Sequence, residues 1–251
     1  MNLTVDGVRM HAEWRRPRVA GRPDLVFLHD GLGSVETLRR LPELVADRLG
    51  LGAFAYDRVG YGRSDAGFPW PTFFMDAAAE LLPRVLDAAG IADCVLVGHS
   101  DGGTVALLYA GAAPAQVRAV ATVSAHIFID AFTSRELARH RQMVADGDFP
   151  SFLSQFHGAR GPDVMRAWVE ALSDPAYRGW DLRKAISGIR APLLALQGAD
   201  DNYGLPSQLD GIKEAAPHAE IELMPGIGHF PQVEAPDRIA ERIAAFVARH
   251  M

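Results

Sequence analysis

The sequence has a single cysteine, no long apolar run and no excess of positive charge, and each of these absences excludes a class of protein. With only Cys94, its 251 residues cannot form an internal disulfide. No stretch has the length of a membrane span, and residues 1–10 lack the apolar core of a secretory signal. The formal net charge of -6 disfavours nucleic acid and anionic membranes as partners. We expect a soluble, cytoplasmic protein, and the sequence leaves a homodimer open.

Short apolar segments alternate with segments of helical spacing along most of the chain. The apolar segments cover residues 25–28, 53–56, 94–97, 117–124, 192–196 and 220–224. The helical segments cover about 34–49, 72–89 with an expected kink at Pro83, 101–113 and 236–249. Ahead of them, residues 2–5 and 8–14 predict a hairpin that turns at Asp6-Gly7. This alternation predicts an α/β fold, with a mostly parallel sheet covered by helices on both faces.

One segment, residues 126–185, interrupts the alternation with helical patterns and no convincing strand. We interpret it as a helical insertion, acting as a lid, in a core domain formed by residues 1–125 and 186–251. Thr133 and Glu136 have the spacing of a capping box and predict a helix start. Some of the insertion's aromatic side chains are expected to line an apolar pocket for a partly hydrophobic substrate; these are Phe149, Phe152, Phe156, Trp168 and Trp180.

The candidate nucleophile is Ser100, in the run Gly98-His99-Ser100-Asp101-Gly102. The run fits G-x-S-x-G, in which a strand turns so sharply into a helix that the residues two before and two after the serine must be glycine. The serine is then held in a strained conformation with its hydroxyl exposed. A turn that only packs strand against helix is the structural alternative, but the apolar segments on both sides favour the catalytic reading.

A serine hydroxyl needs a histidine base, and three histidines follow the apolar segment at 192–196. His250 lies next to the terminus, and His218 lies where a strand is about to begin. His229 lies in a glycine-rich loop at the carboxyl end of a strand, where an imidazole can reach a serine. We therefore predict His229 as the base.

The base in turn needs a carboxylate to fix its tautomer. Residues 193–198 form an apolar segment that ends in glycine and is followed by two carboxylates, Asp200 and Asp201. Either could be the acid, and both could instead only cap the turn.

An oxyanion hole requires two backbone N–H groups near the serine, each worth about 3 kcal/mol. The N–H of Asp101, at a helix start, is one candidate, and Gly31 or Leu32 is the other. The same stretch does not complete a dinucleotide fingerprint, and no P-loop or zinc motif occurs. We predict no cofactor and no metal site.

The chain resembles the α/β-hydrolase superfamily in five signatures that occur in the expected order. They are LHDGLGS at 28–34, YDRVGYGRS at 56–64, GHSDG at 98–102, GADD at 198–201 and GH at 228–229. The resemblance covers almost the whole chain and implies an eight-stranded sheet with a small helical lid. It also implies Asp201, three residues after its glycine, as the acid and Gly31 as the second oxyanion donor.

Two carboxylates, Asp30 and Asp101, depart from the family pattern close to the predicted oxyanion hole. We favour the reading in which the Asp101 side chain points away and interacts with the helix N-terminus. The alternative is that one of the two binds a donor group on the substrate.

The predicted function is that of an esterase-like serine hydrolase, with Ser100, His229 and Asp201 cleaving a carboxylic ester or lactone through an acyl-enzyme. Carbon–carbon bond hydrolases, hydroxynitrile lyases and cofactor-free haloperoxidases resemble the same pattern and are the alternative. Dehalogenases and epoxide hydrolases would need an aspartate in place of Ser100. A ligand-binding module without catalysis is the third reading, which an intact triad disfavours.

Overall fold

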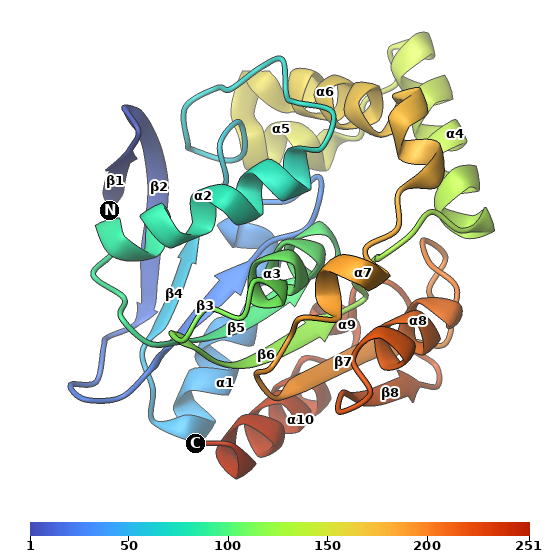
Figure 1. The fold of residues 1–251 in the computed structure, drawn as a ribbon. Helices are drawn as coiled ribbons and strands as arrows, with labels where there is room; N and C mark the ends of the chain where they lie inside the picture. Colours follow the sequence, from blue (N-terminus) through green and yellow to red (C-terminus); the bar gives the residue numbers. More distant parts are fainter.

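The computed structural model describes all 251 residues, and its centre is one sheet of eight strands. Their spatial order is β1-β2-β4-β3-β5-β6-β7-β8 (Figure 1). All neighbours from β4 to β8 pair in parallel, whereas β1 and β2 are antiparallel to their neighbours. The strands are β1 (Asn2–Val5), β2 (Val8–Arg16), β3 (Asp24–Leu28), β4 (Ala53–Tyr56), β5 (Cys94–His99), β6 (Val117–Val123), β7 (Leu193–Gly198) and β8 (Glu220–Met224).

Helices cover both faces of the sheet, as the buried, continuously apolar strands require (Figure 1). One face is covered by α1 (Leu41–Leu49) and α10 (Pro236–Arg249), whose apolar sides form one hydrophobic core with the strands. The second core lies on the other face, under α2 (Phe74–Ala88), α3 (Asp101–Gly111), α7 (Arg183–Ile186) and α8 (Ser207–Ala215). A short helix, α9 (Pro231–Glu234), follows β8. The α/β-hydrolase fold predicted from the sequence is therefore confirmed.

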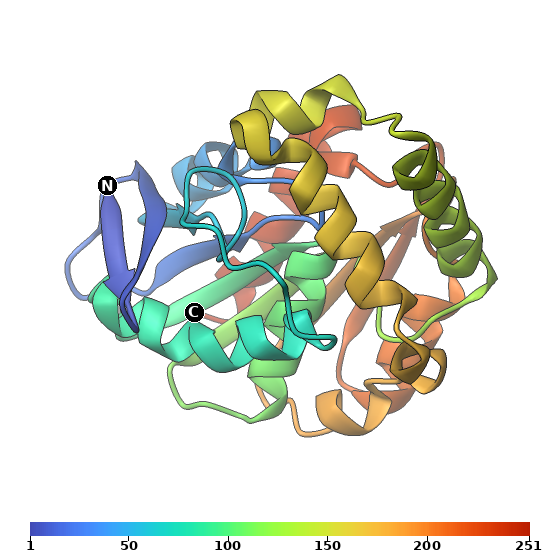
Figure 2. The ribbon, with the colours of Figure 1, turned by 90° about the horizontal axis from the view of Figure 1, so that it is seen from above.

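The helical insertion lies between β6 and β7 and contains only helices. They are α4 (Ala131–Asp146), α5 (Ser151–His157), the 3₁₀ turns η2 (Gly158–Arg160) and η3 (Pro175–Gly179), and α6 (Gly161–Ser173). A bridge between Phe128 and Asp181 holds its two ends together. Seen from above, α6 crosses over the middle of the sheet (Figure 2). No helix of the chain has both the length and the apolarity to cross a bilayer.

One expectation about a helix is corrected by the structure. The segment 34–49 is not one helix, because Arg39 has a φ of 53° and separates the 3₁₀ turn η1 (Val35–Leu38) from α1. Pro83 lies inside α2, which continues to Ala88.

The predicted capping box at Thr133 is also wrong, because the N-cap of α4 lies three residues earlier. Its N-cap is Asp130, whose carboxylate accepts hydrogen bonds from the backbone N–H groups of Phe132 and Thr133, both at 2.8 Å. Thr133 is thus already inside the helix, and its hydroxyl donates to the backbone oxygen of Tyr203. Aspartate is at least as favourable as threonine at an N-cap, so the spacing of Thr133 and Glu136 alone did not decide the position.

Candidate active site

Ser100 lies at the turn from β5 into α3, in backbone space that non-glycine residues rarely adopt. Its φ of 52° and ψ of -123° are those of a strained residue. A side chain at Gly98 would overlap the backbone of Gly102, and a Cβ at Gly102 would lie 2.5 Å from the backbone oxygen of His29. Gly98 therefore lets the start of α3 fold back against the end of β5, and Gly102 lets it pass close to the end of β3.

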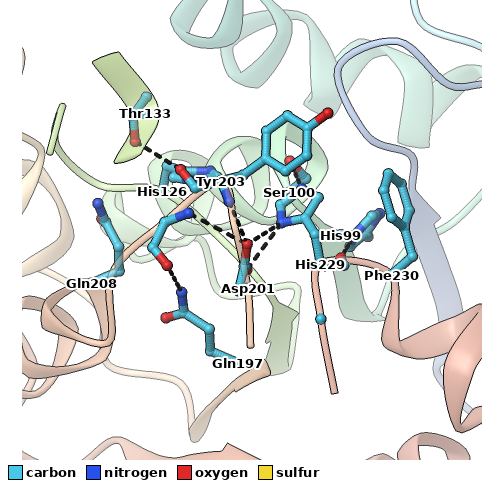
Figure 3. Close-up of polar contacts among 12 residues, drawn as sticks. His99, Ser100, His126, Thr133, Gln197, Asp201, Tyr203, Gln208, His229 and Phe230 are labelled. Carbon is cyan, nitrogen blue, oxygen red and sulfur yellow. Dashed lines mark hydrogen bonds and ion pairs between the residues drawn. The ribbon is translucent and has the colours of Figure 1, made fainter. Parts of the chain in front are cut away.

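The structure brings the three predicted catalytic side chains into one hydrogen-bonded row (Figure 3). His229 Nε2 lies 3.1 Å from Ser100 Oγ. The other ring nitrogen, Nδ1, lies 2.9 and 3.0 Å from the two carboxylate oxygens of Asp201. A carboxylate can only accept, so Nδ1 carries the proton and Nε2 is the free acceptor that faces the serine hydroxyl.

Between the two candidate carboxylates, Asp201 reaches the histidine and Asp200 does not. Asp201 is buried, and its Oδ1 also accepts the backbone N–H of Tyr203 at 2.8 Å. Asp200 is exposed at the same turn. A hydrogen bond from His99 also fixes the loop that carries His229, because His99 Nε2–H donates to the backbone oxygen of His229 at 2.7 Å.

Burial and charge set the protonation of this row. Burial lowers the pKa of His229 below its ordinary value, and this effect exceeds the opposing effect of Asp201. Burial would raise the pKa of Asp201, but the hydrogen bond and charge of His229 together with the Tyr203 N–H hold it below its usual range. Near neutral pH the row therefore contains a carboxylate and an uncharged imidazole, which is the state that a general base needs.

The backbone N–H groups predicted for the oxyanion hole belong to residues that line the same cavity as Ser100, and they have no hydrogen-bond partners in the protein. This is true of Asp101 at the start of α3 and of both Gly31 and Leu32 in the β3 loop (residues 29–34). A Cβ at Gly31 would lie 2.5 Å from the indole nitrogen of Trp168 and would overlap the Asp101 carboxylate. Only glycine fits there, so the β3 loop closely approaches the start of α3.

A cavity of about 440 Å³ opens above Ser100, between the sheet and the helical insertion. Phe152, Phe156, Trp168 and Trp180 line it, as expected from the sequence, whereas Phe149 does not. Phe149 instead packs on α6, with the guanidinium of Arg166 4.6 Å from its ring centre. The volume is that of a small-molecule site. No cluster of three or more histidine, cysteine, aspartate or glutamate side chains is arranged to hold a metal ion.

Comparison with known proteins places this fold and site in a family. The model of the "Alpha/beta hydrolase family" matches residues 25–242. The chain belongs to this family. Among curated relatives, this hydrolase is 26% identical to the sn-1-specific diacylglycerol lipase ABHD11 of Mus musculus, over 90% of this chain and 81% of the lipase.

Solved structures show the same fold at lower identity. A membrane phospholipase A, described as a bacterial virulence factor, superimposes with a TM-score of 0.82 at 22% identity, over 99% of this chain and 85% of that one. The enol-lactonase from Burkholderia xenovorans gives a TM-score of 0.77 at 17% identity, over 99% of this chain and 100% of that one.

The hydrolase contains a link between the insertion and the core that the sequence did not reveal. His157, at the end of α5, is buried and touches two core loops. Its Nδ1 accepts the backbone N–H of Gly62 at 2.9 Å, and its Nε2–H donates to the backbone oxygen of Leu32 at 2.9 Å. Burial lowers the pKa of His157. Its neutral ring therefore joins the β3 loop to the β4 loop (residues 57–64).

The two unusual carboxylates of this hydrolase have different surroundings. Asp30 accepts the Thr37 hydroxyl at 2.6 Å and lies 3.9 Å from His99. Burial would raise the pKa of Asp30, but His99 and Thr37 outweigh it and hold the pKa below its usual range. Asp101 does not turn to the helix N-terminus as we expected. Its Oδ2 accepts the indole N–H of Trp168, on α6, at 2.9 Å.

Proposed function

We propose that the protein is a serine hydrolase that cleaves a carboxylic ester or lactone of a small, partly hydrophobic molecule. The observation that carries this proposal is the row from Ser100 Oγ through His229 to Asp201, with distances of 3.1 and 2.9 Å. Ser100, at the start of this row, has a strained backbone and lies on the floor of the cavity. A hydroxyl, a neutral imidazole and a buried carboxylate in this order are the parts required for acyl transfer.

In the first half of the reaction, Ser100 Oγ attacks the ester carbonyl carbon while its proton passes to His229 Nε2. Asp201 stabilises the imidazolium and keeps its Nδ1 proton in place. The N–H groups of Asp101 and of Gly31 or Leu32 bind the negative oxygen of the tetrahedral intermediate. Its collapse breaks the ester bond, and His229 gives its proton to the leaving alcohol.

In the second half, water replaces the serine as nucleophile. His229 takes a proton from the water, whose oxygen attacks the acyl carbon bonded to Ser100 Oγ. The second tetrahedral intermediate uses the same N–H groups, and its collapse returns the proton to Ser100 and releases the acid. The helical insertion covers the cavity and acts as the lid that limits access of bulk water.

The preference for esters is supported by the lining of the cavity and by one relative. Aromatic and aliphatic side chains make up 13 of the 27 residues that line the cavity, and these suit an acyl or ring portion of the substrate. The curated relative named as a diacylglycerol lipase cleaves, by its name, an ester bond.

A fluorophosphonate probe and a panel of p-nitrophenyl esters and lactones test the proposal. The wild type is expected to form one covalent adduct at Ser100 and to hydrolyse part of the panel, and Ser100→Ala is expected to do neither. Asp200→Asn is the control for the general effect of removing a carboxylate near the site. Turnover that persists in Ser100→Ala contradicts the covalent step. Saturable binding of the esters without any labelling or turnover supports a binding module instead.

A further inference from the structure

The carboxylate of Asp101 is a buried charge without a cationic partner. The residue is 6% exposed, and its Oδ2 accepts only the Trp168 indole N–H. Its Oδ1 has no hydrogen-bond partner in the protein and is not among the buried atoms closed off from solvent. Asp101 lines the cavity, so this oxygen is available to a bound molecule. Burying an unpaired carboxylate is costly, and a fold keeps one most readily where a ligand compensates it.

The carboxylate also lies at the one place where the proposed reaction makes a negative charge. The backbone N–H of Asp101 is a proposed oxyanion donor, and its side chain lies against Gly31, the other candidate side of the hole. Like charges a few ångströms apart in a partly buried site repel strongly. With a neutral ester, Asp101 therefore destabilises the tetrahedral intermediate.

The other charged side chains of the cavity do not relieve this repulsion. The cavity is lined by three carboxylates, those of Asp30, Asp101 and Glu136, and by two guanidinium groups, those of Arg39 and Arg139. The lining therefore has one more negative than positive group. Arg139 is paired with Glu136 at 2.8 Å. Arg39 is exposed, and its guanidinium lies over the ring of Phe156. Neither arginine contacts Asp101.

We propose that the substrate carries a positive charge, a quaternary or protonated amine, beside the scissile ester carbonyl, and that Asp101 Oδ1 binds it. This inference rests on the proposed serine hydrolase activity. The aromatic rings of Trp180 and Tyr203 line the same cavity and add favourable surfaces for an ammonium group. The cation compensates Asp101 when the substrate binds and also stabilises the developing oxyanion, so its effect is expected on both KM and kcat.

Two pairs of esters that differ only in charge test the proposal. The phenyl esters of N,N,N-trimethylglycine and 3,3-dimethylbutanoic acid place the charge in the acyl part. Acetylcholine and 3,3-dimethylbutyl acetate place it in the alcohol part. Within each pair a quaternary carbon replaces a quaternary nitrogen. Comparing the charged-to-neutral ratio of kcat/KM between enzyme variants cancels the intrinsic reactivity of the esters.

Asp101→Asn removes the charge but keeps an oxygen that accepts the Trp168 indole N–H, and Trp168→Phe removes that N–H but keeps the charge. In at least one pair, Asp101→Asn is expected to lower the charged-to-neutral ratio of kcat/KM about tenfold or more. Trp168→Phe is expected to change it by less than about threefold. An unchanged ratio in both pairs for Asp101→Asn, or an equal fall for Trp168→Phe, overturns the proposal. Circular dichroism of both variants verifies that they are folded.

The cation site and the proposed function fail in distinguishable ways. If Ser100-dependent cleavage of p-nitrophenyl acetate is present while neither ratio responds to Asp101→Asn, the hydrolase stands and the cation site is wrong. If no ester is cleaved, calorimetric titration with phenyltrimethylammonium tests the cation site without turnover. Binding to wild type about tenfold tighter than to Asp101→Asn supports it, and equal affinity overturns it.

Discussion

Replacing Gly102 with alanine tests whether the turn at Ser100 depends on the close approach of two backbones. A Cβ at this position would lie 2.5 Å from the backbone oxygen of His29 and 2.5 Å from the carbonyl carbon of Leu28. An unstrained carbon–oxygen contact is about 3.3 to 3.6 Å. Both contacted groups belong to the backbone at the end of β3, which is bonded into the sheet on both sides. The start of α3 must therefore shift by about 1 Å.

That shift has two expected consequences. The free energy of unfolding falls by about 3 kcal/mol, the upper part of the range for inserting a methyl group into a packed site. The Asp101 N–H and the Ser100 hydroxyl move with the helix, and a misplacement of about 1 Å lowers kcat by about 100-fold.

Urea unfolding followed by circular dichroism measures the first effect, and steady-state hydrolysis of a p-nitrophenyl ester measures the second. Gly179→Ala is the matched control, because a Cβ there meets no atom within 4 Å. It is expected to change the free energy of unfolding by less than about 0.5 kcal/mol. A Gly102→Ala variant within about 1 kcal/mol of wild type, with unchanged kcat, would refute the packing argument for the elbow.

Three further outcomes follow from the same site. Asp201→Asn is expected to lower kcat by about 10⁴-fold, because the amide no longer fixes the tautomer of His229. The kcat of Asp200→Asn is expected to stay within about twofold of wild type, and equal losses in the two variants would contradict the choice of Asp201 as the acid. Because burial lowers the pKa of His229, kcat/KM measured against pH should decline only below about pH 6.5, and a midpoint at or above pH 7 would count against this base. Burial keeps His157 neutral in the folded state, whereas the same histidine in the unfolded chain binds a proton as the pH falls below about 6.5. The free energy of unfolding therefore decreases as the pH falls through this range. Denaturant titrations of His157→Phe should show a shallower loss, by up to about 1.4 kcal/mol per pH unit, and an identical slope would argue against the buried neutral ring.

The strands and the elbow were predictable because their signals are local. A segment of consecutive apolar residues that ends in glycine predicts a buried strand. A serine that follows such a strand, with one glycine two residues before it and another two residues after it, can adopt few backbone conformations. The order of serine, carboxylate and histidine then selected His229 from nine histidines. Choosing Asp201 over Asp200 needed the family pattern, because both follow the same strand and differ only in the direction of the side chain.

Errors arose where two residues compete for one role. Asp130 and Thr133 are both good N-caps, and the structure starts α4 at the first of them. Which one is used depends on contacts outside the helix: Asp130 also accepts the backbone N–H of Leu205 and the side chain of Gln208. These partners are far away in the sequence, so no local spacing reports them.

The direction of the Asp101 side chain and the role of His157 were not predictable for the same reason. Trp168, which binds the Asp101 carboxylate, and the loop groups that bind His157 come from distant parts of the chain. A lone histidine in a helix gives no signal in the sequence that both of its ring nitrogens have partners. Only the packing of α5 and α6 on the core reveals these contacts.

The contact of His157 with Leu32 has a consequence for protein engineering. Exchanging the helical insertion for that of a relative is an attractive way to change specificity, because the insertion is continuous in sequence and its ends lie together. In this chain the exchange also removes the imidazole that joins the β3 and β4 loops. A chimera is therefore expected to need a histidine grafted at the equivalent of position 157, or it will gain a new pocket and lose the position of the loop that we propose supplies the second oxyanion donor.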